Sequence, residues 1–316
     1  MDIYEFIYSI IIHASFMTFV YFIIFTCIIY VVYRYIIDYL FSKDNHINYE
    51  IFMNSFIQVI SRDNYFMNYG YWIEPNQTLL KANTNLVDLI FEKADLAGKK
   101  DLAILDVGCG YGEQDFYWLT KLDSSNALIA IDISDSQIQI AKGKCKKMGL
   151  ESRLFFKYGD ALLINAIFAG KQFDTILSVE SAFHYKDRPY FFKSVYNILK
   201  PNGTFVICDI VLNNDYTPGI FNSIFLKIFS DFLHFPKSNL IKSDEWEQSI
   251  KNSGLIITEI VDITDKTFNP YYNSCFHSFI LSKCLPDFIA LQLYNLFAYV
   301  QPFSYKIATC KKIIEV

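Results

Sequence analysis

The sequence has no excess of positive charge. Its 28 Lys and Arg residues are outnumbered by 33 Asp and Glu residues, which gives a formal net charge of -5. Proteins that bind DNA or RNA need a basic surface to neutralise phosphates. The charge balance therefore predicts no nucleic-acid partner and favours a small-molecule substrate.

The sequence also lacks paired cysteines. Zinc sites and secreted disulfide frameworks use closely spaced cysteines, but here no CxxC pair occurs. The seven cysteines are odd in number and scattered: Cys27, Cys109, Cys145, Cys208, Cys275, Cys284 and Cys310. This pattern indicates reduced thiols and predicts no metal site.

Fixed charge is absent from a long stretch near the N-terminus. No Asp, Glu, Lys or Arg occurs between Glu5 and Arg34, and about 20 apolar residues suffice to cross a bilayer. A cleaved signal peptide would need a basic start, a shorter apolar region and a small-residue cleavage site, and none is present. We therefore predict a transmembrane anchor in residues 1–45, with a buried helical hairpin as the alternative.

The charges flanking this stretch predict its orientation. Asp2 and Glu5 precede it, whereas Arg34 and Lys43 follow it, and basic residues favour the cytosolic side of a membrane. The sequence thus predicts a single-pass membrane protein whose C-terminal bulk faces the cytosol. A hydrophobic content of 53% and a mean hydropathy of +0.21 further indicate contact with lipid or a lipophilic ligand.

From Asp101 onward, short apolar runs alternate with helical patterns, as in doubly wound α/β domains. Helices are expected to begin near Glu113, Ser136, Arg188 and Ser243. The expected strands are LAILDVG, ALIAIDI, RLFFKYGD, FDTILSVE, TFVICDI, LIITEIVDI and one near SYKIATCKKI. The predicted fold is a Rossmann-like α/β domain with a seven-stranded sheet over residues 99–316.

Two segments lie outside the predicted sheet. Residues 46–98 are predicted to form an N-terminal helical cap. Residues 213–242 are predicted to form an inserted amphipathic helical lid, with ordinary core packing as the alternative. The apolar residues of the lid recur at helical spacing: Ile220, Phe221, Ile224, Phe225, Ile228, Phe229 and Phe232.

A glycine-rich run, LDVGCGYG, joins the first predicted strand to a helix through Gly108, Gly110 and Gly112. Glycine lets the backbone turn sharply and approach a ligand closely. The dinucleotide fingerprint GxGxxG would need a glycine where this chain has Glu113. An anionic side chain there suits a pyrophosphate poorly, so the run argues against NAD.

Two carboxylates end the next two predicted strands. Asp132, 22 residues after Gly110, is expected to accept hydrogen bonds from both hydroxyls of a ribose. Asp160 ends the third strand and is expected to reach an adenine amino group. A helix cap is the alternative for Asp160.

The segments LDVGCGYG, IDIS, GDA, FDTILSVESAFHY and LKPNGTFVICDI resemble, in order and spacing, the motifs of class I methyltransferases that use S-adenosylmethionine (SAM). The chain is most similar to small-molecule enzymes of the natural-product and lipid type, including macrolide, sugar, tocopherol and glycolipid methyltransferases. The likeness covers roughly residues 66–270. Glu113 and Asn202 depart from the usual motifs without blocking the site.

The resemblance implies a role for each cofactor-binding residue. Four residues hold the methionine end of SAM: Asp106, Gly108, Cys109 and Gly110. Asp132 with Ile133 holds the ribose, and Asp160 with Ala161 holds the adenine. Two aromatic residues close over the sulfonium or the substrate: Tyr71 and Trp72.

The run SVESAFHY ends the fourth predicted strand, at the edge where ligands bind in open α/β sheets. Methylation of a hydroxyl requires loss of its proton, and histidine, with an ordinary pKa of about 6.5, accepts protons at neutral pH. His184 is therefore the candidate general base, with a structural histidine as the alternative. Asp209, after the fifth strand, is expected to orient His184 or bind the acceptor.

The sequence thus predicts a SAM-dependent methyltransferase that acts at a membrane on a small lipophilic acceptor, with an oxygen acceptor favoured. Three alternatives remain: an inactive SAM-binding membrane scaffold, a C- or N-methyltransferase of a lipid or sterol-like molecule, and an NAD-dependent reductase. The sequence does not identify the acceptor or the oligomeric state.

Overall fold

The computed structural model describes residues 65–74, 76–217, 235–271, 273–274 and 302–313, together with the isolated residues 219, 223, 226 and 230. Within these ranges, no helix combines the length and apolar character that crossing a bilayer requires. The predicted anchor, the first part of the predicted cap and the apolar lid residues lie outside the described residues.

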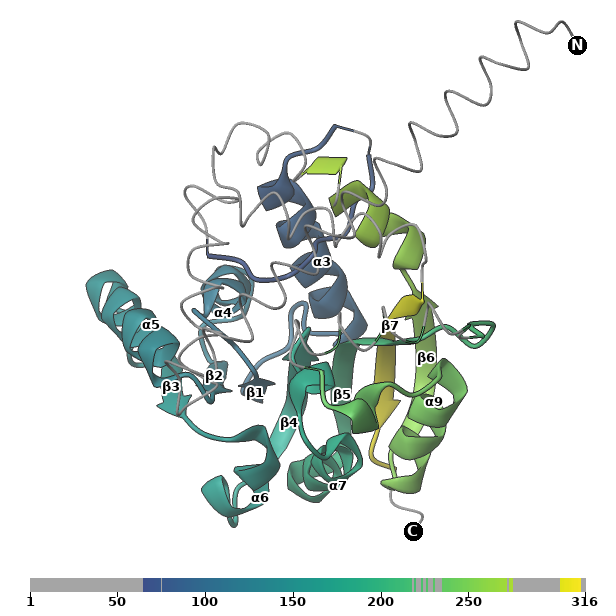
Figure 1. Ribbon diagram of the computed structural model, residues 1–316. Helices are drawn as coiled ribbons and strands as arrows, with labels where there is room; N and C mark the ends of the chain where they lie inside the picture. The colour runs from purple at the N-terminus through teal and green to yellow at the C-terminus, as the bar shows by residue number, and fades with distance from the viewer. Residues whose placement is uncertain are drawn as a thin grey trace, which may run out of the picture. The chain divides into compact units, whose positions relative to one another are not determined.

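A mixed sheet of seven strands forms the centre of the described fold (Figure 1). Its strands are β1 Ala103–Val107, β2 Ala127–Asp132, β3 Leu154–Tyr158, β4 Phe173–Val179, β5 Leu199–Leu212, β6 Ile256–Asp262 and β7 Phe303–Lys311. The strand order is β3-β2-β1-β4-β5-β7-β6. Strand β7 runs antiparallel to both β5 and β6, and the remaining pairs are parallel. The predicted seven-stranded Rossmann-like sheet is confirmed.

Helices precede and connect the strands. They are α3 Leu79–Lys93, α4 Glu113–Leu119, α5 Asp135–Met148, α6 Ile164–Ile167, α7 Arg188–Ile198 and α9 Ser243–Asn252. Short 3-10 helices occur at η1 Ala161–Leu163, η2 Ala182–His184, η3 Lys237–Asn239 and η4 Thr264–Lys266. The predicted helix starts agree with the structure to within one residue.

The helices cover both faces of the sheet. Leu105 and Val107 share a buried apolar cluster with residues of α6, α7 and α9. Because successive side chains of a strand point to opposite faces, Asp106 faces the other side. There Gln114 of α4 donates a hydrogen bond to Asp106 at 2.5 Å. Helix α4 therefore lies on the face opposite α7 and α9.

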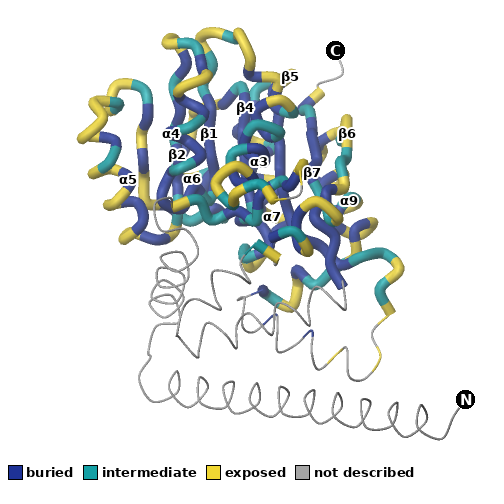
Figure 2. Tube along the Cα trace, turned by 90° about the horizontal axis from the view of Figure 1, so that it is seen from above, coloured by how far each residue is buried: buried dark blue, intermediate teal, exposed yellow. Residues whose placement is uncertain are grey.

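The core lies in the middle of the sheet. Strands β1, β4 and β5 are buried over most of their length, whereas β3 and β6 have several exposed residues (Figure 2). Helix α3 belongs to the same compact unit, and its Val87 carbonyl accepts the indole N–H of Trp118 at 2.8 Å.

The strand order creates a crevice at one edge of the sheet. After β1 the chain proceeds outward through β2 and β3, then returns to place β4 on the other side of β1. The connections therefore diverge between β1 and β4. Open α/β sheets bind ligands outside the carboxyl ends of the strands at this point, where the glycine loop after β1 and the loop after β4 meet.

Candidate active site

The glycine loop after β1 is closely packed at the carboxyl edge. The backbone N–H groups of Gly108 and Cys109 both donate to the carbonyl of Ile131, at 2.8 and 3.1 Å. Gly108 has a φ of +86°, and a Cβ there would lie 2.3 Å from the Cβ of Ser181. The loop therefore depends on glycine at position 108 for both conformation and space.

Asp132 ties this loop to the next helix. One carboxylate oxygen accepts from the N–H of Gly110 at 2.9 Å, and the other accepts from the N–H of Ser134 at 2.9 Å. Ser134 caps α5 in turn, accepting from the N–H of Gln137 at 3.3 Å. The Asp132 side chain is only partly buried, so it remains accessible at the edge where the ribose contact is expected.

Asp160 has the capping role that was the alternative interpretation. Its Oδ1 accepts from the N–H of Leu162 at 2.9 Å at the start of η1. Ala161 is buried, whereas Ile133 after β2 is 47% exposed. The apolar Ile133 is therefore open to a ligand beside Asp132.

Two buried acids lie beneath the glycine loop. Asp106 and Asp115 are both fully buried. One oxygen of Asp106 and both oxygens of Asp115 receive no hydrogen bond from any N–H or hydroxyl group in the described part of the chain, and the two carboxyl groups are within hydrogen-bonding reach of each other. Burial raises the pKa of Asp106 to about 7. Burial and the nearby charge of Asp106 raise the pKa of Asp115 well above its usual range. At neutral pH the pair therefore retains a proton.

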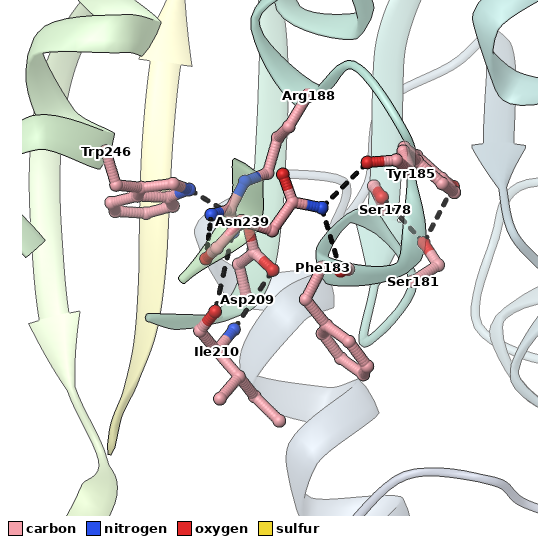
Figure 3. Close-up of polar contacts among 9 residues, drawn as sticks. All are labelled: Ser178, Ser181, Phe183, Tyr185, Arg188, Asp209, Ile210, Asn239 and Trp246. Carbon is pink, nitrogen blue, oxygen red and sulfur yellow. Dashed lines mark hydrogen bonds and ion pairs between the residues drawn. The ribbon is translucent and has the colours of Figure 1, made fainter. Parts of the chain in front are cut away.

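The ends of β1 and β4 are joined by hydroxyl groups. Ser181 donates from Oγ to the carbonyl of Val107 at 2.9 Å, and the Tyr185 hydroxyl lies 2.9 Å from that Oγ. Ser178, near the end of strand β4, shares a 2.9 Å hydrogen bond with Ser181 (Figure 3). These contacts fix the loop after β4 beside the glycine loop.

Glu180, at the end of β4, is held in an unusual conformation. Its φ is +50°, a left-handed value that non-glycine residues rarely adopt. Its Oε1 accepts hydrogen bonds from the backbone N–H of Tyr69, at 2.7 Å, and from the hydroxyl of Tyr305. Loss of hydration raises the pKa of Glu180 to about 8, although these two hydrogen bonds oppose the shift. The sequence placed Glu180 at this edge but assigned it no role.

His184 ends η2 in the same loop and is partly exposed. Its ring centroid lies 4.2 Å from that of Phe183 and 5.9 Å from that of Phe235. The side chain is thus accessible, with aromatic neighbours. Its role as general base stays a prediction.

Asp209 does not pair with His184 as expected. Its Oδ2 accepts hydrogen bonds from Arg188 Nη1 and Trp246 Nε1, both at 2.9 Å (Figure 3). Its Oδ1 accepts from the N–H of Ile210 at 3.0 Å. Because Arg188 and Trp246 belong to α7 and α9, the carboxylate points into the helical layer and is buried there. Orientation of His184 by Asp209 would therefore be indirect, and the alternative role of binding the acceptor stays a prediction.

The hydrogen-bond network of Asp209 and Arg188 extends to the loop that carries His184. Arg188 Nη2 donates to the carbonyl of Asn239 at 2.9 Å. The Asn239 amide donates to the carbonyls of Phe183 and Tyr185, at 2.9 and 2.7 Å, which flank His184 (Figure 3). Asp209 therefore reaches the loop through Arg188 and Asn239, a connection that no sequence motif revealed.

Tyr71 and Trp72 are bound by hydrogen bonds from their backbone N–H groups to the carbonyls of Ala82 in α3 and Lys266 in η4. Trp72 is buried, and its indole N–H donates to the carbonyl of Tyr69 at 2.9 Å. The ammonium of Lys266 lies 5.3 Å from the centroid of the Tyr71 ring. The structure thus places both aromatics against the core and η4, where the sequence had placed them over the sulfonium.

Residues slightly earlier in the chain contact the glycine loop instead. A Cβ on Gly110 would lie 2.9 Å from the Sδ of Met67. The rings of Tyr65 and Tyr111 pack at 5.3 Å. The sequence assigned no role to Met67, although it lies within the stretch that resembles the family, and Tyr65 lies just before that stretch. Within the described ranges no cluster of three metal-ligating side chains occurs.

The fold, with a glycine loop after β1 and a carboxylate at the end of β2, is of the α/β class that binds ligands at the carboxyl edge of its sheet. Residues 98–269 match the family described as a methyltransferase domain, more than half of the chain, and the protein belongs to this family. It is a SAM-dependent methyltransferase of the kind that acts on natural products and sterols.

Individual relatives agree with this assignment. The chain is 28% identical to erythromycin 3''-O-methyltransferase of Saccharopolyspora erythraea, over 73% of this chain and 74% of that protein. It is 26% identical to sterol 24-C-methyltransferase of Aspergillus fumigatus, over 53% of this chain and 43% of that protein.

Solved structures share the fold. Geranyl diphosphate C-methyltransferase from Streptomyces coelicolor superposes with a TM-score of 0.64 at 15% identity, covering 83% of this chain and 97% of that one. The 4+2 cyclase SpnF superposes with a TM-score of 0.69 at 18% identity, covering 83% and 94%. Because a cyclase shares the fold, the fold alone does not determine the acceptor chemistry.

Proposed function

We propose that this methyltransferase transfers the methyl group of SAM to a hydroxyl group of a small lipophilic molecule at a membrane. The observation that carries the proposal is the partly exposed His184 in the loop after β4, between Ser181 and Tyr185, whose hydroxyls contact the carbonyl of Val107 at the end of β1. The similarity to an O-methyltransferase of a macrolide supports an oxygen acceptor. A sterol enzyme among the relatives supports a lipophilic one.

The residues at the β1–β4 crevice fit SAM. Gly110 N–H and the partly buried Asp132 lie together at the end of β2, and Ile133 beside them is 47% exposed, so this edge is open to a ligand. Asp106, Gly108, Cys109 and Gly110 would hold the methionine end. Asp132 and Ile133 would hold the ribose. Asp160 and Ala161 would hold the adenine, with Asp160 using Oδ2, the oxygen that does not cap η1.

When bound, SAM supplies an electrophilic methyl group on a sulfonium. The protein aligns the acceptor with it and removes the hydroxyl proton, and alignment itself contributes substantially to rate. His184 accepts that proton during transfer. The Asp209–Arg188–Asn239 network holds the backbone on either side of His184, so it positions the base without touching it.

The cofactor site is tested by calorimetry with S-adenosylhomocysteine (SAH), the product of SAM. Asp132→Ala removes a carboxylate expected to accept from both ribose hydroxyls, so affinity should fall by about 2–3 kcal/mol, or roughly 30- to 150-fold. Asp135→Ala, on the exposed start of α5, is the matched control and should bind normally. Equal binding by all three proteins would contradict the assignment of Asp132.

Activity is tested with SAM carrying a tritiated methyl group and an organic extract of the cells that produce the protein. The expected result is label in the organic phase, in a product with an ether-linked methyl group. A chain that binds SAH but transfers no label is instead an inactive SAM-binding scaffold. A product methylated on carbon or nitrogen would contradict the oxygen acceptor but not the methyltransferase activity.

The membrane location rests on residues 1–45, from their apolar composition and flanking charges. We infer a single-pass anchor with the catalytic domain in the cytosol. Carbonate-washed membranes should retain the full chain, and an engineered glycosylation site near residue 300 should stay unmodified. Release into the wash rejects the anchor, and glycosylation rejects its orientation.

A further inference from the structure

The Glu180 side chain is held in a defined position at the site, but it has no role in the proposed proton transfer to His184. Both of its identified donors, the N–H of Tyr69 and the hydroxyl of Tyr305, reach Oε1. A carboxylate oxygen has two lone pairs, so these donors occupy Oε1. Among the described residues, Oε2 makes no hydrogen bond, and the side chain is partly exposed. Oε2 is therefore free to contact a bound molecule.

The groups that hold Glu180 are rigidly packed. The ring of Tyr69 meets that of Tyr271 at 4.9 Å and that of Phe268 at 5.7 Å, and Phe268 meets Tyr305 at 5.7 Å. All three pairs are edge-to-face, a favourable aromatic geometry. This cluster fixes a strained residue, since Glu180 has a φ of +50°. Strain of this kind persists where the surroundings enforce it, often at functional sites.

Glu180 lies between the predicted cofactor loop and this aromatic cluster. The next residue, Ser181, contacts Gly108 so closely that a Cβ there would be 2.3 Å away. On the other side, the backbone N–H of Glu180 donates to the carbonyl of Cys208 on β5 at 2.9 Å. Glu180 thus directly precedes the residue that packs against the loop expected to hold the methionine end of SAM.

The protonation of Glu180 follows from its surroundings. Burial raises its pKa to about 8. The titratable groups that face it are Tyr305 on β7 and Cys208 on β5, and burial raises the pKa of both well above their usual ranges. Neither group is charged at neutral pH. Since Oε1 accepts two hydrogen bonds, the proton resides on Oε2 and can be donated.

We propose that Glu180 binds the methyl acceptor, donating a hydrogen bond from Oε2 to an oxygen atom adjacent to the hydroxyl that is methylated. This inference rests on the proposed function and narrows its substrate class. The acceptor carries a second hydroxyl, an ether or a carbonyl next to the reacting hydroxyl. A lipophilic alcohol with a single isolated oxygen lacks this contact.

Glu180 keeps its proton throughout the reaction. As the bond from sulfur to the methyl carbon breaks, its electron pair stays on sulfur and a bond from oxygen to that carbon forms. The proton of the reacting hydroxyl passes to His184. Glu180 therefore acts through binding and alignment, which a neutral donor such as glutamine can reproduce.

The test compares Glu180→Gln and Glu180→Ala in the full chain, in detergent, using tritiated SAM and the organic extract. Glu180→Gln retains a neutral donor and should keep activity within a few-fold of wild type at pH 7. Glu180→Ala should lose about 10- to 100-fold, the range expected for one lost hydrogen bond in a site. SAH affinity should be unchanged in both. Glu259→Gln, at an exposed glutamate on β6, is the matched control.

The pH profile separates binding from a structural role. Wild-type activity should fall above about pH 8 as Glu180 ionises, whereas Glu180→Gln should lack this decline. Because the Tyr305 hydrogen bond opposes the upward shift of the Glu180 pKa, Tyr305→Phe should move the decline to higher pH. Carbon-13 NMR of labelled glutamate carboxyls should show one group titrating near pH 8, and that signal should be absent in Glu180→Gln.

Each result is decisive. If Glu180→Gln is as inactive as Glu180→Ala while SAH still binds, the reaction requires the ionised carboxylate, and the inference is overturned. A Glu180→Ala variant with full activity, or a Glu180 carboxyl titrating below pH 6, also overturns it. If the wild-type chain transfers no label, the proposed function fails, while the NMR titration still judges the protonation of Glu180.

Discussion

Arg188 and Asp209 form an ion pair of 2.9 Å in which neither side chain is more than 1% exposed. Removing two charges from water costs several kcal/mol each, and only close pairing with additional hydrogen bonds offsets this cost. Trp246 and Asn239 provide such bonds, at 2.9 Å each. The pair therefore joins α7, α9 and β5 behind the loop that carries His184.

Breaking this pair should destabilise the fold. Arg188→Met leaves the Asp209 carboxylate buried without its counter-ion, which typically costs about 3–5 kcal/mol. Lys99→Ala is the control, because its ion pair with Asp95 is exposed and such pairs contribute at most about 1 kcal/mol. Denaturant unfolding of the full chain measures both. Similar losses for the two variants would contradict the importance assigned to the buried pair.

The double replacement of Arg188 by Met and Asp209 by Leu tests the cause of that loss. Apolar residues of similar size leave no buried charge, so part of the stability lost in Arg188→Met should return. The Trp246 indole N–H would still lose its acceptor, so recovery should be incomplete. A double variant less stable than Arg188→Met would show that packing, and not unpaired charge, dominates.

Gly108→Ala should abolish cofactor binding. Its Cβ would meet the Cβ of Ser181 at 2.3 Å in a residue with a φ of +86°, so the loop must move away from β4. SAH affinity should fall below detection in calorimetry. Gly143→Ala is the matched control, because this exposed helical glycine has nothing within 4 Å of its added Cβ. It should bind SAH normally and gain about 0.5–1 kcal/mol of stability.

The sequence predicted features that depend on local patterns. The strand ends, the glycine loop and the helix starts each follow from a few consecutive residues, because apolar runs and glycines report on backbone conformation directly. Asp132 was placed correctly at its strand end for the same reason. Its bonds to the Gly110 and Ser134 N–H groups lie within the motif itself.

The features that the sequence missed depend on contacts between distant segments. Glu180 pairs with Tyr305 across 125 residues, and Asp209 pairs with Arg188 on a different element. Which face of β5 Asp209 occupies is decided by the packing of α7 and α9. Trp72 was assigned to the site on its aromatic character, but its burial depends on how the chain before α3 packs.

The buried acids beneath the glycine loop should make stability depend on pH. Burial raises the pKa of Asp106 to about 7 and raises that of Asp115 well above its usual range; an unfolded aspartate has a pKa of about 3.9. The folded state then binds more protons than the unfolded state, so stability is fully present below about pH 4. It should decline as pH rises toward 7 and beyond.

Asp115→Asn should reduce this decline. Asparagine has nearly the same shape and no charge to bury, so the variant should gain stability relative to wild type at pH 8 and gain little at pH 4. Thermal unfolding in matched buffers measures the difference. Asp135→Asn, on the exposed first turn of α5, should change stability equally at both pH values. A parallel pH dependence for wild type and Asp115→Asn would contradict the prediction.

His184→Ala should separate proton removal from binding. General-base catalysis contributes about 100- to 10,000-fold, so label transfer from tritiated SAM should fall by that range while SAH affinity stays unchanged. Lys186→Ala, an exposed neighbour in the same loop, should retain full activity. The wild-type profile should be bell-shaped, with an acidic limb from His184 and an alkaline limb from Glu180. His184→Ala should lose the acidic limb and Glu180→Gln the alkaline one, because the two residues bind different atoms of the acceptor.

If His184→Ala transfers label within a few-fold of wild type, alignment alone carries the reaction. A nitrogen or carbon acceptor then fits the site better, since a neutral amine attacks the methyl group without a base.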